Sequence, residues 1–106
     1  MKVVVTGANG FLGSWLTRKL SQKNFDVHIL ARPTSDLSDL KGLSYKVFLG
    51  DVTNPQSLEK AFEGAQGVFH LAGVVAYRSE DRALMEKVNV QGTDFVIKAA
   101  EKMKVP

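Results

Sequence analysis

Three glycines at three-residue intervals stand between a valine-rich run and a segment with helical periodicity. Gly7 can adopt the backbone angles that a sharp strand-to-helix turn needs, and Gly10 leaves room for a pyrophosphate to approach main-chain N–H groups. Gly13 lets the following helix pack closely, and the free N–H groups at the start of that helix attract an anion. The turn therefore predicts a dinucleotide site, whose candidate binding residues are Gly7, Asn9, Gly10, Phe11, Leu12 and Gly13.

Arg32 lies about 20 residues after these glycines, where residues of such sites contact the adenosine ribose. A carboxylate there would bond the 2′-hydroxyl, whereas a guanidinium attracts a 2′-phosphate and stacks on adenine. We therefore expect NADP as the cofactor, with NAD as the alternative, because a flexible loop could bring Asp36 or Asp39 to the ribose. Arg32 could also be an ordinary exposed loop residue.

Further candidates follow the third and fourth predicted strands. Asp51 could accept the adenine amino group while Val52 packs on the ring, but Asp51 could equally begin a turn with Thr53 and Asn54. The segment Leu71-Ala72-Gly73 has small residues that permit close approach of a cofactor ribose. A glycine at a strand end is also common, so this segment is weak evidence by itself.

For polar residues within apolar segments, a structural role is the first interpretation, before a catalytic or metal-binding one. His70 and His28 lie in predicted strands without the spacing of a catalytic triad or metal site, so we expect core hydrogen bonds from them. Asn89 lies between two valines of a predicted helix, where a buried amide needs partners. From the residues alone, Asn89 is more simply a structural residue.

These candidates need strands and helices to position them, and the sequence alternates the two. Hydrophobic runs predict strands over about 2–6, 26–31, 45–49 and 67–71, the last covered on both faces. Helical periodicity predicts helices over about 11–23, from Pro55 to Gly64 with Asn54 as cap, and over 81–103; residues 33–44 form a loop with one short helical turn. The core-facing stripe expected for the first helix is Phe11, Leu12, Trp15, Leu16 and Leu20.

Alternating strands and helices predict an α/β fold with parallel strands and right-handed crossovers. The expected architecture is a Rossmann-type sheet of order 3-2-1-4 with helices on both faces. In such sheets ligands bind beyond the carboxyl ends of the strands, where all the candidates above lie.

Composition agrees with one small α/β domain over residues 1–106. The sequence is 44% hydrophobic and 24% charged, and its net charge of +3 comes from scattered residues. We therefore expect neither nucleic-acid nor membrane partners, and a cytoplasmic location. Cysteine is absent, which excludes disulfides and thiolate metal sites.

Motifs in the correct order resemble the extended short-chain dehydrogenase/reductases: Thr6-Gly7-x-x-Gly10-x-x-Gly13, Asp51-Val52, His70-Leu71-Ala72-Gly73 and Asn89-Val90-x-Gly92-Thr93. The segment Phe11-Leu12-Gly13-Ser14-Trp15-Leu16 and the arginine after the second strand are most similar to the dihydroflavonol 4-reductase branch. The resemblance implies pyrophosphate binding by the backbone from Gly10 to Leu12, adenine contact at Asp51 and Val52, and ribose contact from Leu71 to Gly73. It also implies that Asn89 supports catalysis by helping to organise a proton-relay water.

The family's catalytic serine and its Tyr-x-x-x-Lys pair lie beyond the long helix. Tyr45 and Tyr77 are followed four residues later by Leu49 and Asp81, so neither provides that pair. We therefore expect the chain to stop before the fifth strand, to be the cofactor-binding half of an oxidoreductase, and to be inactive alone.

Three functions remain open for the whole protein. The first is NADPH-dependent reduction of a small-molecule ketone or aldehyde, and the second is an NAD-dependent sugar-nucleotide epimerase or dehydratase. The third is a non-catalytic nucleotide-sensing module. Because the fourth strand would form an apolar edge, we also expect self-association.

Overall fold

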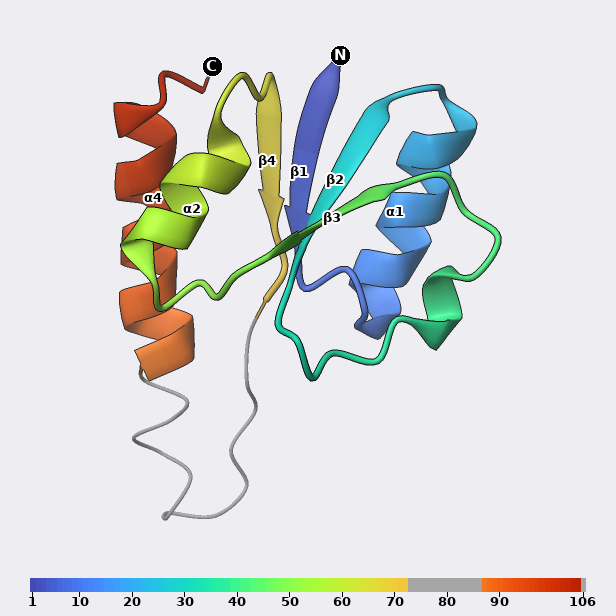
Figure 1. The fold of residues 1–106 in the computed structure, drawn as a ribbon, viewed down its shortest axis with the longest axis horizontal. Helices are drawn as coiled ribbons and strands as arrows, with labels where there is room; N and C mark the ends of the chain where they lie inside the picture. The colour runs from blue at the N-terminus through green and yellow to red at the C-terminus, as the bar shows by residue number, and fades with distance from the viewer. Residues whose placement is uncertain (73–86, 106) are drawn as a thin grey trace.

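The computed structural model describes residues 1–72 and 87–105, in which strands and helices alternate along the chain (Figure 1). The first part contains β1 (Lys2–Thr6), α1 (Phe11–Gln22), β2 (Asp26–Ala31), the short 3-10 helix η1 (Ser38–Leu40), β3 (Lys46–Leu49), α2 (Pro55–Phe62) and β4 (Gly67–His70). The second part contains the π-helical turn η3 (Lys87–Gln91) and α4 (Gly92–Lys102). The first six residues of the predicted long helix, 81–86, lie outside the described residues.

All four strands are parallel and lie in the order β3-β2-β1-β4, which confirms the predicted topology. In the central strand, Val4 lies opposite His28 of β2 and Val68 of β4. The three consecutive valines of β1 suit this position, because a central parallel strand is buried on both faces.

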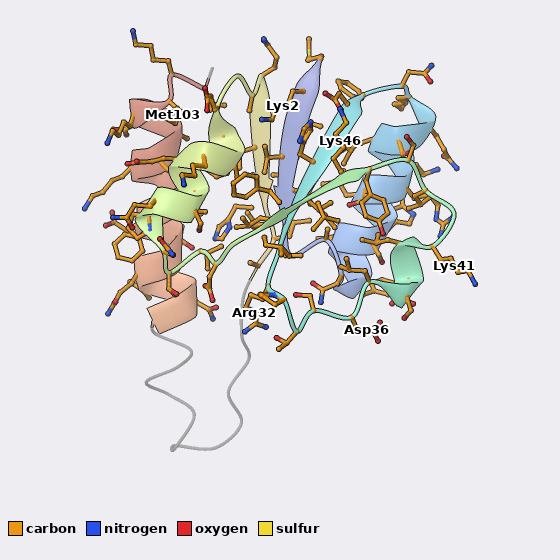
Figure 2. All side chains as sticks on the ribbon, in the orientation of Figure 1. Lys2, Arg32, Asp36, Lys41, Lys46 and Met103 are labelled. Carbon is orange, nitrogen blue, oxygen red and sulfur yellow. The ribbon has the colours of Figure 1, made fainter. Side chains whose placement is uncertain are left out.

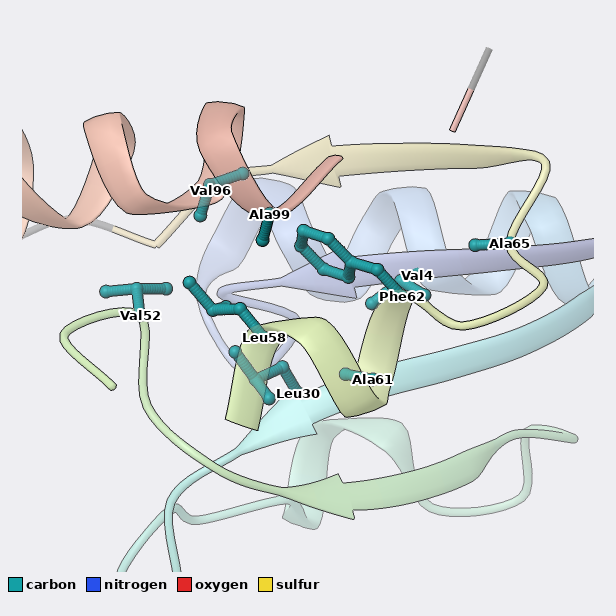
Figure 3. Close-up of a cluster of buried hydrophobic side chains, with 9 residues drawn as sticks. All are labelled: Val4, Leu30, Val52, Leu58, Ala61, Phe62, Ala65, Val96 and Ala99. Carbon is teal, nitrogen blue, oxygen red and sulfur yellow. The ribbon is translucent and has the colours of Figure 1, made fainter. Parts of the chain in front are cut away.

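Helices cover both faces of the sheet, with α1 and η1 on one side and α2 and α4 on the other (Figure 1). Alternate side chains of β1 divide between the two cores: Val3 and Val5 pack on the α1 side, and Val4 packs against α2 and α4. The second core is centred on Leu58 and Phe62 of α2 (Figure 3). No helix among residues 1–72 and 87–105 is long and apolar enough to cross a membrane.

The predicted core-facing stripe of α1 is wrong for its aromatic residues. Phe11 is 93% exposed and Trp15 54% exposed, and Leu12 is 58% exposed, whereas the buried residues of α1 are Gly13, Thr17 and Leu20. With 3.6 residues per turn, Phe11 and Trp15 lie about half a turn away from that buried face. The prediction is right for Leu20, which is buried, and for Leu16, which packs against the same core. The buried face also carries the small residues Gly13 and Thr17, which a ranking by hydrophobicity does not select.

The predicted ends of α2 are confirmed. The Asn54 side-chain oxygen accepts hydrogen bonds from the N–H groups of Gln56 (3.1 Å) and Ser57 (3.3 Å), and Pro55 takes the first helical position. Gly64, just after the helix, has a φ of +73°, which favours glycine.

The prediction for β4 is only partly right. Val68 packs into the core beside α2 and α4, but Phe69, on the opposite face of the same strand, is 37% exposed. Phe69 lies opposite Val5, on the α1 face of the sheet. The coverage that the apolar run predicted is therefore incomplete on this face of β4.

Candidate cofactor-binding site

The glycine turn after β1 contains two glycines that the chain itself requires. Gly7 has a φ of +71°, and a Cβ on it would lie 2.5 Å from the backbone nitrogen of Ala72. A Cβ on Gly13 would lie 1.9 Å from the carbonyl oxygen of Gly7, the residue that follows β1. These contacts confirm the sharp turn and the close approach of helix α1.

Gly10 differs from both, because residues 1–72 and 87–105 place no steric demand on it. Its φ of −80° and ψ of 174° are open to any residue, and among these residues a Cβ there would meet only the Gly7 carbonyl oxygen, at an ordinary 3.5 Å. The described part of the protein therefore leaves the space beside Gly10 open. A group from outside the fold could approach the main chain here without meeting a side chain.

Helix α1 begins directly at this open position. Gly10 is its N-cap and offers no side-chain hydrogen bond, and its first turn has no acidic residue. The first N–H groups of a helix have no partner within it, so those of Phe11 and Leu12 need a partner from elsewhere. Asn9, Gly10, Phe11 and Leu12 are all exposed, so an anion has access to this helix start.

Arg32 follows β2 directly, and the chain reverses immediately after it. The Ser35 N–H donates to the Arg32 carbonyl oxygen (2.9 Å), and the Arg32 N–H donates to the Ser35 hydroxyl oxygen (3.0 Å). This turn leaves the Arg32 side chain exposed just past the end of β2 (Figure 2). The backbone polar groups of Arg32 are satisfied, so its guanidinium remains the group available to a ligand.

Asp36 is already engaged at the start of η1. Its carboxylate accepts a hydrogen bond from the Ser38 N–H (3.0 Å), and this bond holds the pKa of Asp36 below its ordinary value. Figure 2 shows Asp36 farther along the loop than Arg32. To bond a ribose, Asp36 would have to give up or share this local contact.

Asp51 forms the turn that was the alternative interpretation of this residue. One carboxylate oxygen, Oδ1, accepts from the N–H and the hydroxyl of Thr53, both at 2.9 Å. Oδ2 accepts no hydrogen bond within residues 1–72 and 87–105, so an adenine contact at Asp51 stays a prediction compatible with the turn. Val52 is buried in the core with Leu58, which leaves little of its side chain for a ring to contact.

The segment after β4 lies against the glycine turn. The Ala72 N–H donates to the Thr6 hydroxyl oxygen (3.2 Å), and the Leu71 N–H is shared between the Thr6 carbonyl oxygen (3.0 Å) and the Thr6 hydroxyl oxygen (3.1 Å). These two amides are therefore engaged within the protein, and a ribose near Ala72 would meet carbonyl oxygens and a methyl group instead. Gly73 lies outside the described residues.

His70 confirms the prediction of core hydrogen bonds. Its Nδ1 lies 2.7 Å from the Thr6 hydroxyl and its Nε2 lies 2.9 Å from the Thr93 hydroxyl, which in turn donates to the Asn89 carbonyl oxygen (2.6 Å). Burial lowers the pKa of His70, so the ring is neutral at neutral pH. His28 instead lies near Asp26, with Nε2 3.1 Å from its carboxylate.

Thr6 and Thr93 were missed as individual site residues by the sequence reasoning. Thr6 is fully buried at the end of a valine run, where a hydroxyl needs partners, and this mismatch was the available signal. Thr93 is four residues after Asn89 in the helical segment, close enough for its hydroxyl to reach that carbonyl.

Parallel pairing brings the candidates to one edge of the sheet. The glycine turn follows β1, Arg32 follows β2, Asp51 closely follows β3, and Leu71 follows β4, all at the carboxyl ends. Arg32 and Asp51 lie on one side of β1, whereas Leu71 and Asn89 lie on the other. An elongated ligand with a central anionic group on the glycine turn would span both sides.

The comparisons with known proteins agree with this arrangement. Residues 3–106 match the model of the NAD dependent epimerase/dehydratase family. The chain is 34% identical to a dihydroflavonol 4-reductase of Gerbera hybrida over 96% of its length, and 41% identical to a cinnamoyl-CoA reductase 1 of Oryza sativa subsp. japonica over 97%. It spans 30% and 31% of those two proteins.

A solved structure shares the same fold. It is a short-chain dehydrogenase/reductase superfamily protein from Agrobacterium tumefaciens with bound NAD, 27% identical with a TM-score of 0.83. The match covers 99% of this chain and 30% of that one.

Proposed function

Because the chain belongs to the NAD dependent epimerase/dehydratase family, we propose that it binds NADP(H) as the cofactor-binding part of a reductase. The proposed reaction is reduction of a ketone or aldehyde, for which the bound cofactor would supply the hydride. Two reductases among the similar proteins support this reaction class.

The observation that carries the proposal is the open space beside Gly10. None of the described residues would conflict with a side chain there, yet the residue is glycine and borders the uncapped start of α1. A diphosphate needs that combination, because its oxygens must come within hydrogen-bond distance of main-chain N–H groups. The residues therefore fit the diphosphate of a dinucleotide.

The preference for NADP(H) rests on Arg32. Its exposed guanidinium follows β2 beside the expected position of the adenosine ribose, where it would bind a 2′-phosphate through charge-assisted hydrogen bonds. The nearest acidic alternative, Asp36, is engaged with Ser38.

Reduction of a carbonyl also needs a proton donor, and this sequence has no Tyr-x-x-x-Lys pair to supply it. We therefore expect the 106-residue chain to bind cofactor without oxidising NADPH in the presence of aldehydes or ketones. Asn89 is proposed to support the reaction from its place on the β4 side of the site.

Calorimetric titration with NADP⁺ and NAD⁺ tests the cofactor preference. The chain should bind NADP⁺ more tightly, and Arg32→Ala should weaken NADP⁺ binding by about tenfold to a hundredfold, the value of a charge-assisted contact, while changing NAD⁺ binding little. Arg18→Ala removes the same charge from an exposed position on α1 and serves as the matched control. Unchanged NADP⁺ affinity in Arg32→Ala would overturn the preference.

An NAD-dependent epimerase or dehydratase is the second candidate. The family description and the bound NAD of the Agrobacterium protein favour it. Tighter binding of NAD⁺ than NADP⁺, weakened by Asp36→Asn, would select this alternative.

A further inference from the structure

A hydrogen-bond chain connects β1, β4 and the turn before α4, and its direction follows from its donors. Thr6 Oγ1 accepts from the Ala72 N–H (3.2 Å) and shares the Leu71 N–H (3.1 Å) with the Thr6 carbonyl oxygen, which accepts it at 3.0 Å. Neither N–H group can accept the Thr6 hydroxyl hydrogen, so among these partners His70 Nδ1, 2.7 Å away, is its acceptor. His70 Nδ1 is then an acceptor and carries no proton.

The other end of the chain is directed in the same sense. The Thr93 hydroxyl donates to the Asn89 carbonyl oxygen, so its oxygen is free to accept from His70 Nε2–H at 2.9 Å. His70 is thus held as the neutral Nε2–H tautomer, with one nitrogen accepting and the other donating. Protonation of Nδ1 would present a third N–H donor to the Thr6 hydroxyl oxygen and leave the Thr6 hydroxyl hydrogen without this acceptor.

The hydrogen-bond chain ends on the turn that carries Asn89. This turn, η3, has π-helical geometry, and its carbonyl at Asn89 is the acceptor for Thr93. The opposite end of the chain lies on Leu71 and Ala72, beside Gly7. The ring of His70 therefore joins the glycine turn to the Asn89 turn across the carboxyl end of β4.

We propose that His70 is a positioning residue: through Thr6 and Thr93 it sets the place of the Asn89 turn relative to the glycine turn. Its consequence for the cofactor rests on the proposed function. With the adenosine half over β2 and β3, the other half of the dinucleotide lies over β4, beside Ala72 and Asn89. Loosening this hydrogen-bond chain should therefore weaken the binding of only this second half of the dinucleotide.

Nuclear magnetic resonance of the isotope-labelled chain tests the coupling without any ligand. The His70 ring should show the neutral Nε2–H tautomer, and Thr6→Val should move the backbone signals of Asn89 and Thr93. Thr17→Val is the matched control, because Thr17 is also a fully buried threonine, yet its hydroxyl has no hydrogen-bond partner among the described residues. The proposal would be overturned by an Nδ1–H tautomer of His70, or by Asn89 backbone signals that do not move in Thr6→Val.

Titrations with two ligands test the consequence for the cofactor. NADP⁺ carries both halves, whereas 2′,5′-ADP carries only the adenosine half and its phosphates. Thr93→Val should weaken NADP⁺ binding by about fivefold, the value of one lost hydrogen bond, leave 2′,5′-ADP binding unchanged, and be rescued by Thr93→Ser. Equal losses for both ligands, or none, would contradict the positioning role.

The two proposals fail in different ways. If the wild-type chain binds neither ligand, the proposed function is wrong, and the resonance experiment still decides whether His70 positions the Asn89 turn. If the chain binds both ligands and Thr93→Val changes neither affinity, the proposed function stands and the positioning role falls.

Discussion

At the scale of single residues, the three glycines of the turn after β1 are needed for different reasons. Gly7 and Gly13 are glycines because backbone atoms of the protein occupy the place of a Cβ. Gly10 meets no such neighbour among the described residues, which agrees with the proposed approach of a ligand there. The sequence shows only the spacing of the three residues, and the structure separates the two required by the fold from the one open to a ligand.

The ring of His70 predicts a pH dependence of stability. Burial lowers its pKa in the folded chain below the unfolded value of about 6.5, so the unfolded chain binds more protons in acid. The stabilisation is complete above that value and is lost as the pH falls toward the folded pKa. The urea midpoint should therefore fall between about pH 8 and about pH 5.

His70→Gln removes the titrating ring and should flatten this dependence. Both proteins keep Asp26 and Asp36, whose pKa values are lowered from 3.8, so the effects of these two carboxyls come at lower pH. The difference between the two profiles therefore isolates His70. Superimposable profiles would show that its protonation is not coupled to folding.

At the scale of elements, the sequence predicted most of the architecture. Hydrophobic β-branched runs located the strands to within about one residue, because such runs act locally. Asn54 and Gly64 act locally in the same way and indicated where α2 begins and ends. The buried face of α1 could be predicted only in part: Leu20 is buried as its hydrophobicity indicates, whereas Gly13 is buried because the Gly7 backbone approaches it closely. The bond from His70 to Thr93 also depends on tertiary packing, which no local pattern encodes.

The cap of α2 gives a prediction at this scale. Asn54→Ala removes the acceptor for two N–H groups at the start of a short helix, so it should lower the free energy of unfolding by about 1 kcal/mol. Urea denaturation measures this loss. Gln56→Ala, at an exposed position in the first turn of the same helix, is the control and should change stability by less than about 0.5 kcal/mol. Equal losses in the two variants would show that the cap contributes nothing.

At the scale of the whole molecule, the apolar edge of the sheet predicts self-association. Among the four described strands, β4 lies at one edge, and its residue Phe69 is exposed. We propose that copies of the chain associate through this strand, because an unpaired strand offers free backbone groups to another. Sedimentation velocity should show the average mass rising with concentration.

Phe69→Lys should suppress this association, because a charge at the edge strand opposes pairing. Val47→Lys places the same charge on β3, the strand at the opposite edge, and should leave the association intact. A wild-type chain that sediments as a monomer at every concentration would contradict the prediction, and loss of association only in Val47→Lys would assign it to β3.

The most direct test of the account is the NADP⁺ affinity of Gly10→Ala. Since Gly10 has a φ of −80° and the described residues leave space for a Cβ, alanine there should raise the free energy of unfolding by about 0.4–1 kcal/mol. The same methyl group would block a diphosphate, so NADP⁺ affinity by calorimetry should fall at least about tenfold, or about 1.4 kcal/mol. A stable Gly10→Ala chain that binds NADP⁺ as tightly as the wild type would contradict the claim that the glycine turn holds the diphosphate.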